Sequence, residues 1–419
     1  MIISKIETIR VGQFPDLIFV QVHTDTGLIG LGETWYAAST VESAIHDHFG
    51  PLLIGRDPAE IERHWQTMFR LSDHAGYGGA ELRAISALDV ALWDIKGQTL
   101  QMPIFEIIGG GTRHRIRVYN TLGVYGDITD GYDVWTDPVG VAKRLLDEGI
   151  TGMKMSPTDF IARESDGQLL FKDDLDWALR PLREIRDKLG MDIEVANDAH
   201  GKWNLPNAIK IVREMEPLRP MWHEELISPL NEEAHARLQS ATSTPIAAAE
   251  RLMTRYQHRR FIESSAARIT MPDLTWTGGI SEVMKIAILA SVHQMPIAPH
   301  DCVGPVNMLA CAHIAMATPN VMIMEYNRAM HLGWYRDFIE PDFVIESGFL
   351  MAPTEPGLGT HLKASVRERT DATVRTSDER AESWLMSRQR YTYPPPEIQD
   401  DFIESTERRK TGSEAVYYD

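Results

Sequence analysis

Acidic residues and a histidine recur at the ends of short apolar runs in the middle of the chain. Three runs end in a carboxylate, at Asp198, Glu224 and Glu250, and the same interval of 26 residues separates each acid from the next. Further runs end at Asp273 and at His300. One βα unit takes roughly 30 residues, so this interval fits parallel strands joined by helices. Side chains at the C-terminal ends of strands in a closed barrel meet at one mouth.

Three carboxylates that share one mouth would repel one another unless a cation lay between them. Hard oxygen ligands in this number suit Mg²⁺. We therefore predict Mg²⁺ as the cofactor, with Asp198, Glu224 and Glu250 as its ligands. For a single acid a solvated loop residue or a helix N-cap would be the simpler interpretation. Glu225 is predicted to line the substrate site beside these ligands, with solvent exposure as an open alternative.

Two histidines are placed to move protons at the same mouth. His300 and Asp273 end neighbouring runs, and a carboxylate on one imidazole nitrogen fixes the tautomer and raises the basicity of the other nitrogen. His200 lies two residues beyond Asp198, and alternation in an extended segment would turn both toward one side. We predict an acid/base role for His200 in preference to metal ligation, because Mg²⁺ prefers oxygen.

The chain resembles the mandelate racemase subgroup of the enolase superfamily. The matching segments span roughly residues 1–362 and include ALDVALWDIKGQTLQMPIFEIIGG, WHEE and MPDLTWTGGI. Within the subgroup, DAHG at 198–201 and APHDCVGPV at 298–306 are similar to acid-sugar dehydratases of the galactonate dehydratase type. The resemblance implies a hydro-lyase that converts an aldonate or aldarate to a 2-keto-3-deoxy acid through an ene-diolate. It also implies that His300 removes the α-proton with Asp273 as its partner, while His200 protonates the departing 3-hydroxyl.

The end of the second barrel strand differs from that of the racemases in this subgroup. Those enzymes carry Lys-x-Lys, whereas this chain has Lys154 and Ser156. A serine cannot replace the second lysine as a base, which disfavours the lysine-dependent racemase and cycloisomerase mechanisms. Lys154 is predicted to pair with the substrate carboxylate, and Ser156 to contact the substrate. An epimerase, racemase or cycloisomerase of a hydroxy acid that works by the same proton abstraction stays open, as does a catalytically silent barrel.

Two further residues are predicted to contact substrate. Glu325 ends the last expected strand and, by the resemblance, hydrogen-bonds the substrate carboxylate. Trp276 is predicted to line the pocket, although a tryptophan there could equally be part of the core.

The surrounding pattern predicts an α/β fold with two parts. Strand and helix patterns alternate over residues 113–326 and predict a parallel sheet, which the resemblance identifies as a modified TIM (β/α)7β barrel. Residues 1–112 are predicted to form an α+β capping domain with helices over 57–71 and 79–100. By the resemblance, residues 327–419 return to this domain and complete it.

Three other stretches carry expectations. Residues 11–16 and 72–81 are predicted to be mobile loops, and in the family such loops cover the barrel mouth and set substrate choice. Glycine lowers the cost of the backbone angles that a closing loop needs. Residues 365–419 lie outside the strong resemblance, and we expect them to be packed, with a neighbouring subunit as one possible partner.

Composition narrows the partners and the compartment. The formal charge of −18 argues against nucleic acid and against an anionic membrane surface. No apolar run approaches the ~18 residues of a membrane span, and no signal peptide is recognisable. Cys302 and Cys311 fit a reducing compartment, so we expect a cytoplasmic protein. A small-molecule carboxylate is the expected partner, and relatives imply a homo-oligomer, either a dimer or an octamer.

Overall fold

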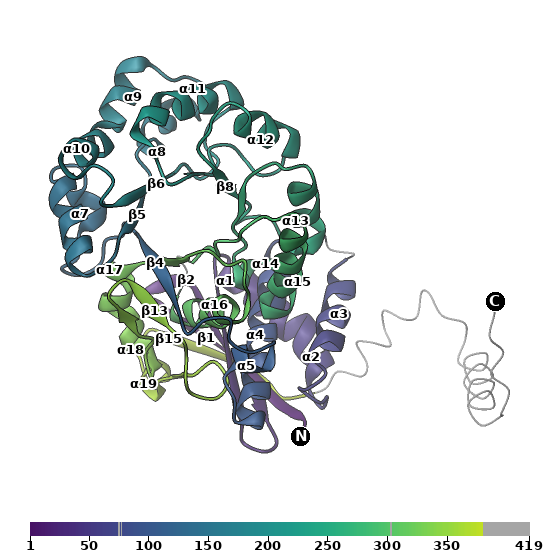
Figure 1. The fold of residues 1–419 in the computed structure, drawn as a ribbon. Helices are drawn as coiled ribbons and strands as arrows, with labels where there is room; N and C mark the ends of the chain where they lie inside the picture. The colour runs from purple at the N-terminus through teal and green to yellow at the C-terminus, as the bar shows by residue number, and fades with distance from the viewer. Residues whose placement is uncertain (74–75, 77, 302–303, 380–419) are drawn as a thin grey trace, which may run out of the picture. The chain divides into compact units, whose positions relative to one another are not determined.

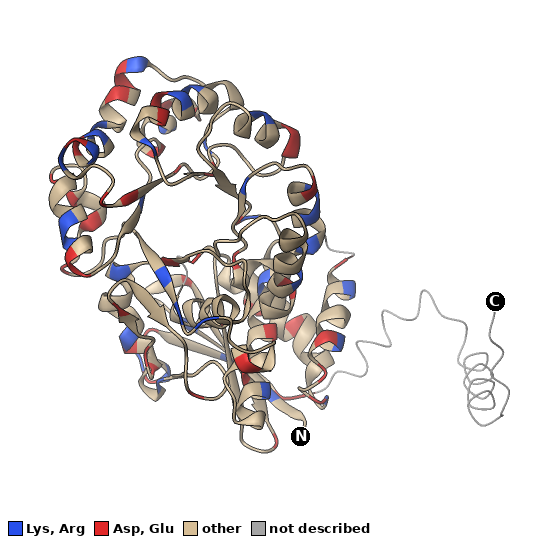
Figure 2. Cartoon of the chain, in the orientation of Figure 1, with Lys and Arg blue, Asp and Glu red and all other residues tan. Residues whose placement is uncertain are grey.

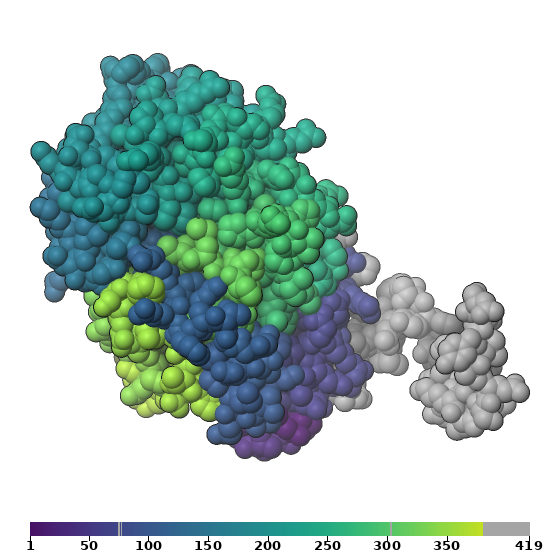
Figure 3. Space-filling view, in the orientation of Figure 1, coloured from purple at the N-terminus to yellow at the C-terminus, as the bar shows by residue number. Residues whose placement is uncertain are grey.

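An antiparallel sheet and a parallel barrel organise the chain (Figure 1). The structure is a computed structural model that describes residues 1–73, 76, 78–301 and 304–379. The sheet has the order β15–β1–β2–β3, formed by Ala372–Ser377, Ile3–Val11, Phe14–Thr24 and Ile29–Trp35. Strand β15 pairs antiparallel with β1, so segments from both ends of the described chain lie side by side. Figure 3 shows the teal and green surface of the barrel without the opening that the ribbon of Figure 1 leaves.

Helix α4 (Ala80–Leu100) packs so closely on β3 that two strand positions have no room for a side chain. A Cβ atom at Gly30 or Gly32 would collide with the helix backbone at Ala91 or Ala87. Helix α3 (Ile61–Ser72) packs beside α4. Both helices lie where the apolar spacing predicts them, and the glycines of β3 explain how an almost fully buried helix can rest on the sheet.

Parallel strands form a closed ring in the described part of the chain. Six of them pair in chain order: β4 (Arg115–Thr121), β5 (Gly152–Met155), β6 (Glu194–Asp198), β7 (His223–Glu224), β8 (Ile246–Ala248) and β9 (Ile269–Thr270). Ile297 then bridges β9 to Val321, and β10 (Met324–Tyr326) pairs with β4. The ring therefore closes on its first strand.

Helices on the outside of the ring connect successive strands (Figure 1). They are α7 (Pro138–Asp147), α9 (Lys172–Ala178) with α10 (Arg180–Leu189), α11 (Leu205–Met215), α12 (Glu232–Gln239), α13 (Thr254–Glu263), α14 (Leu274–Thr277) with α15 (Gly279–Val292), and α16 (Pro305–Ala317). The predicted α/β fold with an N-terminal capping domain and a barrel is confirmed. We propose domain boundaries near residues 112 and 326, just before β4 and at the end of β10.

Inward-facing side chains fill the barrel below its mouth. Tyr119 of β4, Ala196 of β6, Trp222 just before β7 and Ala247 of β8 form one cluster with Met271. The Tyr119 and Trp222 rings meet edge to face, with centroids 5.0 Å apart. These positions alternate along the strands with residues that face the helices. The barrel is thus a packed core, and only the strand ends are left for chemistry.

Two of the predicted segments differ from expectation or lie partly outside the described residues. The mobile loop predicted at 11–16 is wrong, because β1 ends at Val11 and β2 begins at Phe14, which leaves a two-residue turn. The Gln13 backbone N–H donates to Asp371, and its side-chain amide donates to Tyr125, so neighbouring segments fix the turn. In the predicted loop at 72–81, positions 74, 75 and 77 lie outside the described residues.

The C-terminal prediction is also only partly within the described chain. Helix α19 (Ala364–Arg367) and β15 are packed against the capping sheet, as expected for the start of that segment. Residues 380–419 lie outside the described residues, as does Cys302. Cys311 is a buried free thiol. Among the described helices, none combines the length and apolar character needed to cross a membrane.

Glu33 at the end of β3 joins the capping sheet to the barrel. Its carboxylate accepts hydrogen bonds from the backbone N–H groups of Val306 and Asn307, in the first turn of α16, at 3.3 and 3.1 Å. A Cβ atom at Gly304 would collide with this carboxylate. Burial raises the pKa of Glu33 to about 8, nearby Asp273 adds to the increase, and the two helix N–H groups oppose it. The interface therefore holds an acid that is protonated over most of the physiological range.

Replacing Glu33 with glutamine is expected to make unfolding less dependent on pH. Folding raises the pKa of the Glu33 carboxyl from 4.5 to about 8, so its protonated form stabilises the folded state. This stabilisation is fully present below pH 4.5 and is lost as pH rises through 8. Between pH 5 and pH 8, the free energy of unfolding of the wild type should therefore fall by about 3 kcal/mol relative to that of Glu33→Gln. Urea unfolding at both pH values checks this, and a difference that does not change with pH contradicts it.

Candidate active site

The three predicted metal ligands end successive barrel strands at one mouth. Asp198 and Glu224 are register partners at the ends of β6 and β7, and Glu250 follows β8 by two residues. Their side chains are 5%, 0% and 7% exposed. Figure 2 shows acidic residues at several points around the inner ring of the barrel. The three acids therefore lie buried at one mouth, where Glu224 is near enough to Asp198 and Glu250 for their charges to raise its pKa.

Lys154 at the end of β5 lies among these acids. Its Nζ is 2.5 Å from Glu224 Oε1, 2.8 Å from Glu325 Oε1 and 3.6 Å from Asp198 Oδ2. Burial alone would lower the pKa of Lys154, but the surrounding carboxylates outweigh burial and raise it well above its ordinary value. Lys154 is therefore a permanent ammonium ion whose partners here are the protein's own acids.

Glu224 and Glu325 respond in opposite ways to the same ammonium group. Burial and the nearby carboxylates raise the pKa of Glu224 in spite of Lys154, and Trp222 Nε1 donates to Glu224 at 3.0 Å. Burial would also raise the pKa of Glu325, but Lys154, His300 and a hydrogen bond from Thr121 lower it. The mouth contains more negative than positive charge, and a further cation would reduce the repulsion among its carboxylates.

Glu225 points away from this cluster. It is fully buried, so the alternative of solvent exposure is wrong. The carboxylate accepts hydrogen bonds from the Ala249 backbone N–H at 3.0 Å and from Arg251 Nε at 2.7 Å. Burial and Glu250 raise the pKa of Glu225, whereas Arg251 opposes them. Glu225 thereby fixes the loop that carries Glu250, through an arginine partner that was not predicted from the sequence.

His300 and Asp273 form the predicted pair. The two residues form a backbone bridge, and His300 Nδ1 lies 2.8 Å from Asp273 Oδ2. The backbone N–H and the hydroxyl of Thr275 donate to the other carboxylate oxygen at 2.8 and 2.9 Å. His300 Nε2 is directed toward Glu250, at 3.5 Å from Oε2. The imidazole is thus oriented from one side and presents its second nitrogen to the mouth.

His200 is held by a carboxylate that the sequence did not indicate. Its Nδ1 lies 2.8 Å from Asp159 Oδ2, and its Nε2 lies 3.4 Å from Asp198 Oδ2. Burial would lower the pKa of His200, but the hydrogen bond to Asp159 and the charges of Asp198 and Glu250 raise it to about 9. Both predicted histidines therefore lie beside a predicted metal ligand.

Trp276 packs against His300 and also contacts the capping domain. The two ring centroids are 5.0 Å apart, the Arg83 guanidinium lies 4.3 Å from the indole centroid, and Tyr36 lies 5.6 Å from it. The buried Trp276 Nε1 has no hydrogen-bond partner among the described residues. Ser156 follows β5 directly and is partly buried, and its backbone carbonyl accepts from the Asp159 N–H at 3.4 Å.

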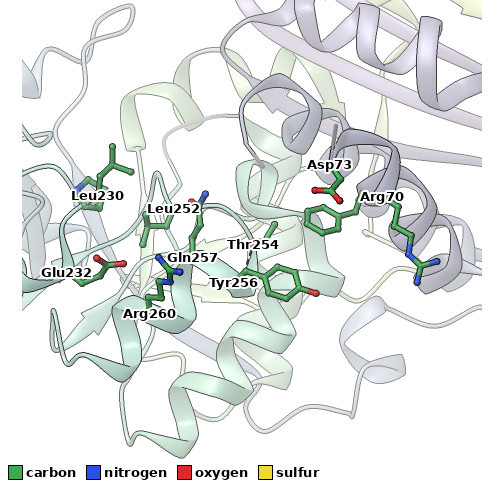
Figure 4. Close-up of a pocket in the computed structure, with 11 residues that line it drawn as sticks. Arg70, Asp73, Leu230, Glu232, Leu252, Thr254, Tyr256, Gln257 and Arg260 are labelled. Carbon is green, nitrogen blue, oxygen red and sulfur yellow. Dashed lines mark hydrogen bonds between the residues drawn. The ribbon is translucent and has the colours of Figure 1, made fainter. Parts of the chain in front are cut away.

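A pocket of about 500 Å³ lies apart from these residues, between α3 and the segments that follow β7 and β8 (Figure 4). Leu252, Thr254 and Tyr256 line it on the barrel side, and Arg70 and Asp73 on the side of α3. It contains none of the predicted site residues. Leu252, which lines the pocket, is only two positions beyond Glu250 in the sequence, but none of the three acids lines it.

The donor chemistry of the mouth fits a divalent cation. Three buried carboxylates on adjacent strand ends supply the hard oxygen ligands that Mg²⁺ prefers. No three acidic, histidine or cysteine side chains already converge on one point within the described ranges 1–73, 76, 78–301 and 304–379. Instead Lys154, His200 and His300 each lie within 3.6 Å of one of the acids.

Comparisons with known proteins agree with this architecture. Residues 8–109 match the family described as mandelate racemase / muconate lactonizing enzyme, N-terminal domain, and residues 139–366 match the family described as enolase C-terminal domain-like. A protein named D-galactonate dehydratase from Variovorax paradoxus is 36% identical over 369 residues, which are 86% of this chain and 92% of that protein. Another of that name from Ralstonia pickettii is 34% identical over 378 residues, 88% of this chain and 94% of the relative.

Solved structures show the same relationship. An enolase of the mandelate racemase subgroup from Agrobacterium tumefaciens superimposes with a TM-score of 0.84 at 36% identity, over 90% of this chain and 99% of that one. A putative dehydratase from Mesorhizobium loti gives a TM-score of 0.80 at 29% identity, over 90% of this chain and all of that one. The chain therefore belongs to the enolase superfamily, in its mandelate racemase subgroup.

Proposed function

We propose that the protein is a hydro-lyase that dehydrates a sugar acid, an aldonate or aldarate, to a 2-keto-3-deoxy acid. The observation that carries this proposal is the pair of imidazoles, His200 and His300, each on its own carboxylate and each beside a buried acid of the same mouth. Two oriented acid/base groups are what removal of a proton from one carbon and of hydroxide from the next require. The relatives named D-galactonate dehydratase support the same reaction class.

We infer that Asp198, Glu224 and Glu250 hold Mg²⁺, on the donor chemistry of the mouth. The bound cation supplies Lewis-acid stabilisation of the negative charge that develops on the substrate carboxylate. Lys154 adds a permanent positive charge at the same place. A small-molecule carboxylate is drawn to these local charges although the whole chain is acidic.

His300 is the proposed base. Asp273 accepts the hydrogen bond from Nδ1, so the proton stays on that nitrogen and Nε2 takes the α-proton of the substrate. Thr275 holds Asp273 through two donors, which keeps the carboxylate in its orientation. The Trp276 indole packs against the imidazole at 5.0 Å and helps to exclude water. We propose that the unpartnered Trp276 Nε1 donates to a substrate oxygen.

His200 is the proposed acid. The proton on Nε2 passes to the departing 3-hydroxyl, the C3–O bond breaks, and the group leaves as water. The electron pair left at C2 by the α-proton forms the C2–C3 double bond, and the resulting enol takes up a proton at C3 to give the 2-keto acid. The geometry supports this role, because Asp159 holds Nδ1 and leaves Nε2 facing the mouth.

Glu325 acts through Lys154 in this proposal. An ionised Glu325 would repel a substrate carboxylate, and the lowered pKa of this residue keeps it ionised. Its hydrogen bonds to Lys154, to Thr121 and to the Asp301 backbone N–H make it a support for the lysine. Ser156 stays a proposed substrate contact, whereas Glu225 acts indirectly, by holding Arg251 and the loop that carries Glu250.

A screen of stereoisomeric aldonic and aldaric acids with Mg²⁺ tests the proposal. Formation of 2-keto-3-deoxy product from one or a few isomers, lost in excess EDTA, is the expected result. Uptake of deuterium at the α-carbon without keto acid would instead establish an epimerase or racemase. No turnover and no Mg²⁺-dependent thermal shift would leave a silent barrel.

Light scattering and cell fractionation would test the further expectations of a homo-oligomer, dimer or octamer, and of a cytoplasmic location.

A further inference from the structure

Asp159 lies where it can control the direction of the His200 ring. It begins the short helix α8 (Asp159–Ala162), four residues beyond the end of β5, and therefore reaches the mouth from a different barrel segment than His200 does. Its Oδ2 is 2.8 Å from His200 Nδ1, while His200 Nε2 is 3.4 Å from Asp198 Oδ2. One ring nitrogen is thus tied to the β5 segment, and the other faces the proposed metal ligands.

The backbone at His200 is fixed independently of Asp159. His200 and Gly201 both have positive φ values, 48° and 65°, so the chain turns sharply after β6. The His200 backbone N–H donates to Asp198 Oδ1 at 3.1 Å. A Cβ atom at Gly201 would collide with the Arg251 guanidinium. Because these contacts hold the backbone, Asp159 is left to determine which way the half-exposed ring points.

Asp159 is itself anchored as a carboxylate. Lys202 Nζ bonds the same Oδ2 atom that His200 contacts. The other oxygen, Oδ1, is buried and has no hydrogen-bond partner among the described residues. His200 therefore has the same kind of support as His300, which Asp273 orients through Nδ1 at the same distance of 2.8 Å.

We propose that Asp159 is a positioning residue for the leaving-group step of the proposed dehydration. The inference rests on the proposed function and extends it by one residue. By holding the Nδ1 proton of His200, Asp159 directs the Nε2 proton at the departing 3-hydroxyl. That proton leaves with the hydroxyl as water, and His200 regains a proton from solvent. Removal of the α-proton belongs to His300 and Asp273 and does not involve Asp159.

This division of labour predicts an unusual pattern in Asp159→Asn. Exchange of the substrate α-hydrogen with solvent deuterium continues, whereas formation of keto acid slows. We expect kcat for dehydration to fall by about 10- to 100-fold with KM changed by less than about threefold, as for loss of a carboxylate that orients an imidazole. The ratio of exchange to dehydration should rise at least about tenfold. A merely structural defect would lower both reactions together.

Two further variants make the experiment decisive. Asp159→Glu keeps the charge and should recover part of the lost dehydration, and it serves as the test if Asp159→Asn does not fold. Asp176→Asn is the matched control, because Asp176 also bonds a lysine, Lys172, but lies on α9 outside the mouth. The control should have the kcat, KM and exchange ratio of the wild type.

The possible failures are distinguishable. If wild type makes keto acid and Asp159→Asn keeps the wild-type ratio of exchange to dehydration, the inference is wrong and the proposed function stands. A parallel loss of both reactions in a folded Asp159→Asn protein also overturns it. If wild type makes no keto acid from any sugar acid, the proposed function fails and the inference fails with it.

Discussion

Asparagine in place of His300 is expected to lower kcat for keto-acid formation by on the order of 10³-fold, since general acid–base groups contribute about 10²- to 10⁴-fold. Asparagine retains a polar group near Asp273 but has no nitrogen that can take up a proton. The His300 side chain is 5% exposed and its imidazole is held by Asp273 at 2.8 Å, so a water molecule has little room to replace it as a base. Exchange of the α-hydrogen with solvent deuterium should be lost as well.

Loss of exchange separates this variant from a change at Asp159, where exchange is retained. The measurement is the rate of keto-acid formation together with deuterium uptake by NMR, on a substrate found in the screen. His114→Asn is a matched control, because His114 is exposed and remote from the barrel mouth in the described structure. If His300→Asn retains more than about a tenth of wild-type exchange, His300 is not the base.

The positions of the main acids could be predicted because strand ends obey a simple rule. Asp198 and Glu224 each end an apolar run, the runs recur at the length of one βα unit, and the structure makes the two residues register partners. The Asp273 and His300 runs are likewise neighbours, joined by a backbone bridge. The barrel and the residues at its mouth can therefore be predicted from the apolar runs and their spacing.

The partners of these residues could not be predicted, because they come from loops whose course the sequence pattern does not specify. Asp159 and Arg251 lie just beyond strand ends, and only the folded backbone brings them to His200 and Glu225. Arg83 reaches Trp276 from the capping domain, across a domain boundary. A periodic pattern records which face of an element is buried. It does not record which side chain from another loop will meet a polar group there.

The role predicted for Lys154 shows the same limit. The pairing of Lys154 with a substrate carboxylate stays a prediction, but the sequence did not indicate that its ammonium group lies against three acids of the protein. The error in the 11–16 segment has a related cause. Glycine content suggested a mobile loop, whereas hydrogen bonds to Asp371 and Tyr125, distant in sequence, hold a tight turn.

Replacing Lys154 with methionine is expected to destabilise the metal-free protein by about 3 to 5 kcal/mol, the usual cost of removing one partner of a buried ion pair. Methionine fills a similar volume but leaves Glu224 and Glu325 without their ammonium group. Keto-acid formation should fall as well, because the variant loses positive charge beside the substrate carboxylate. Urea unfolding in EDTA measures the first effect and the product assay measures the second.

Mg²⁺ should partly restore the stability of Lys154→Met, and more than it stabilises wild type. A ligand that binds only the folded state stabilises it in proportion to the logarithm of its concentration over its dissociation constant. Without Lys154 the carboxylates at the mouth attract a cation more strongly, so the Mg²⁺-dependent increase in melting temperature should be larger in the variant. Lys172→Met removes an exposed lysine on α9 and should show the wild-type increase.

A smaller Mg²⁺ effect in Lys154→Met than in wild type would contradict this account in an informative way. It would mean that the lysine holds Asp198 and Glu224 in the arrangement that binds the cation, so that its positioning effect exceeds its repulsion of Mg²⁺. The two effects differ in their dependence on salt, because screening weakens the repulsion of like charges more than it changes a packed geometry. Repeating the measurement at high ionic strength therefore distinguishes them.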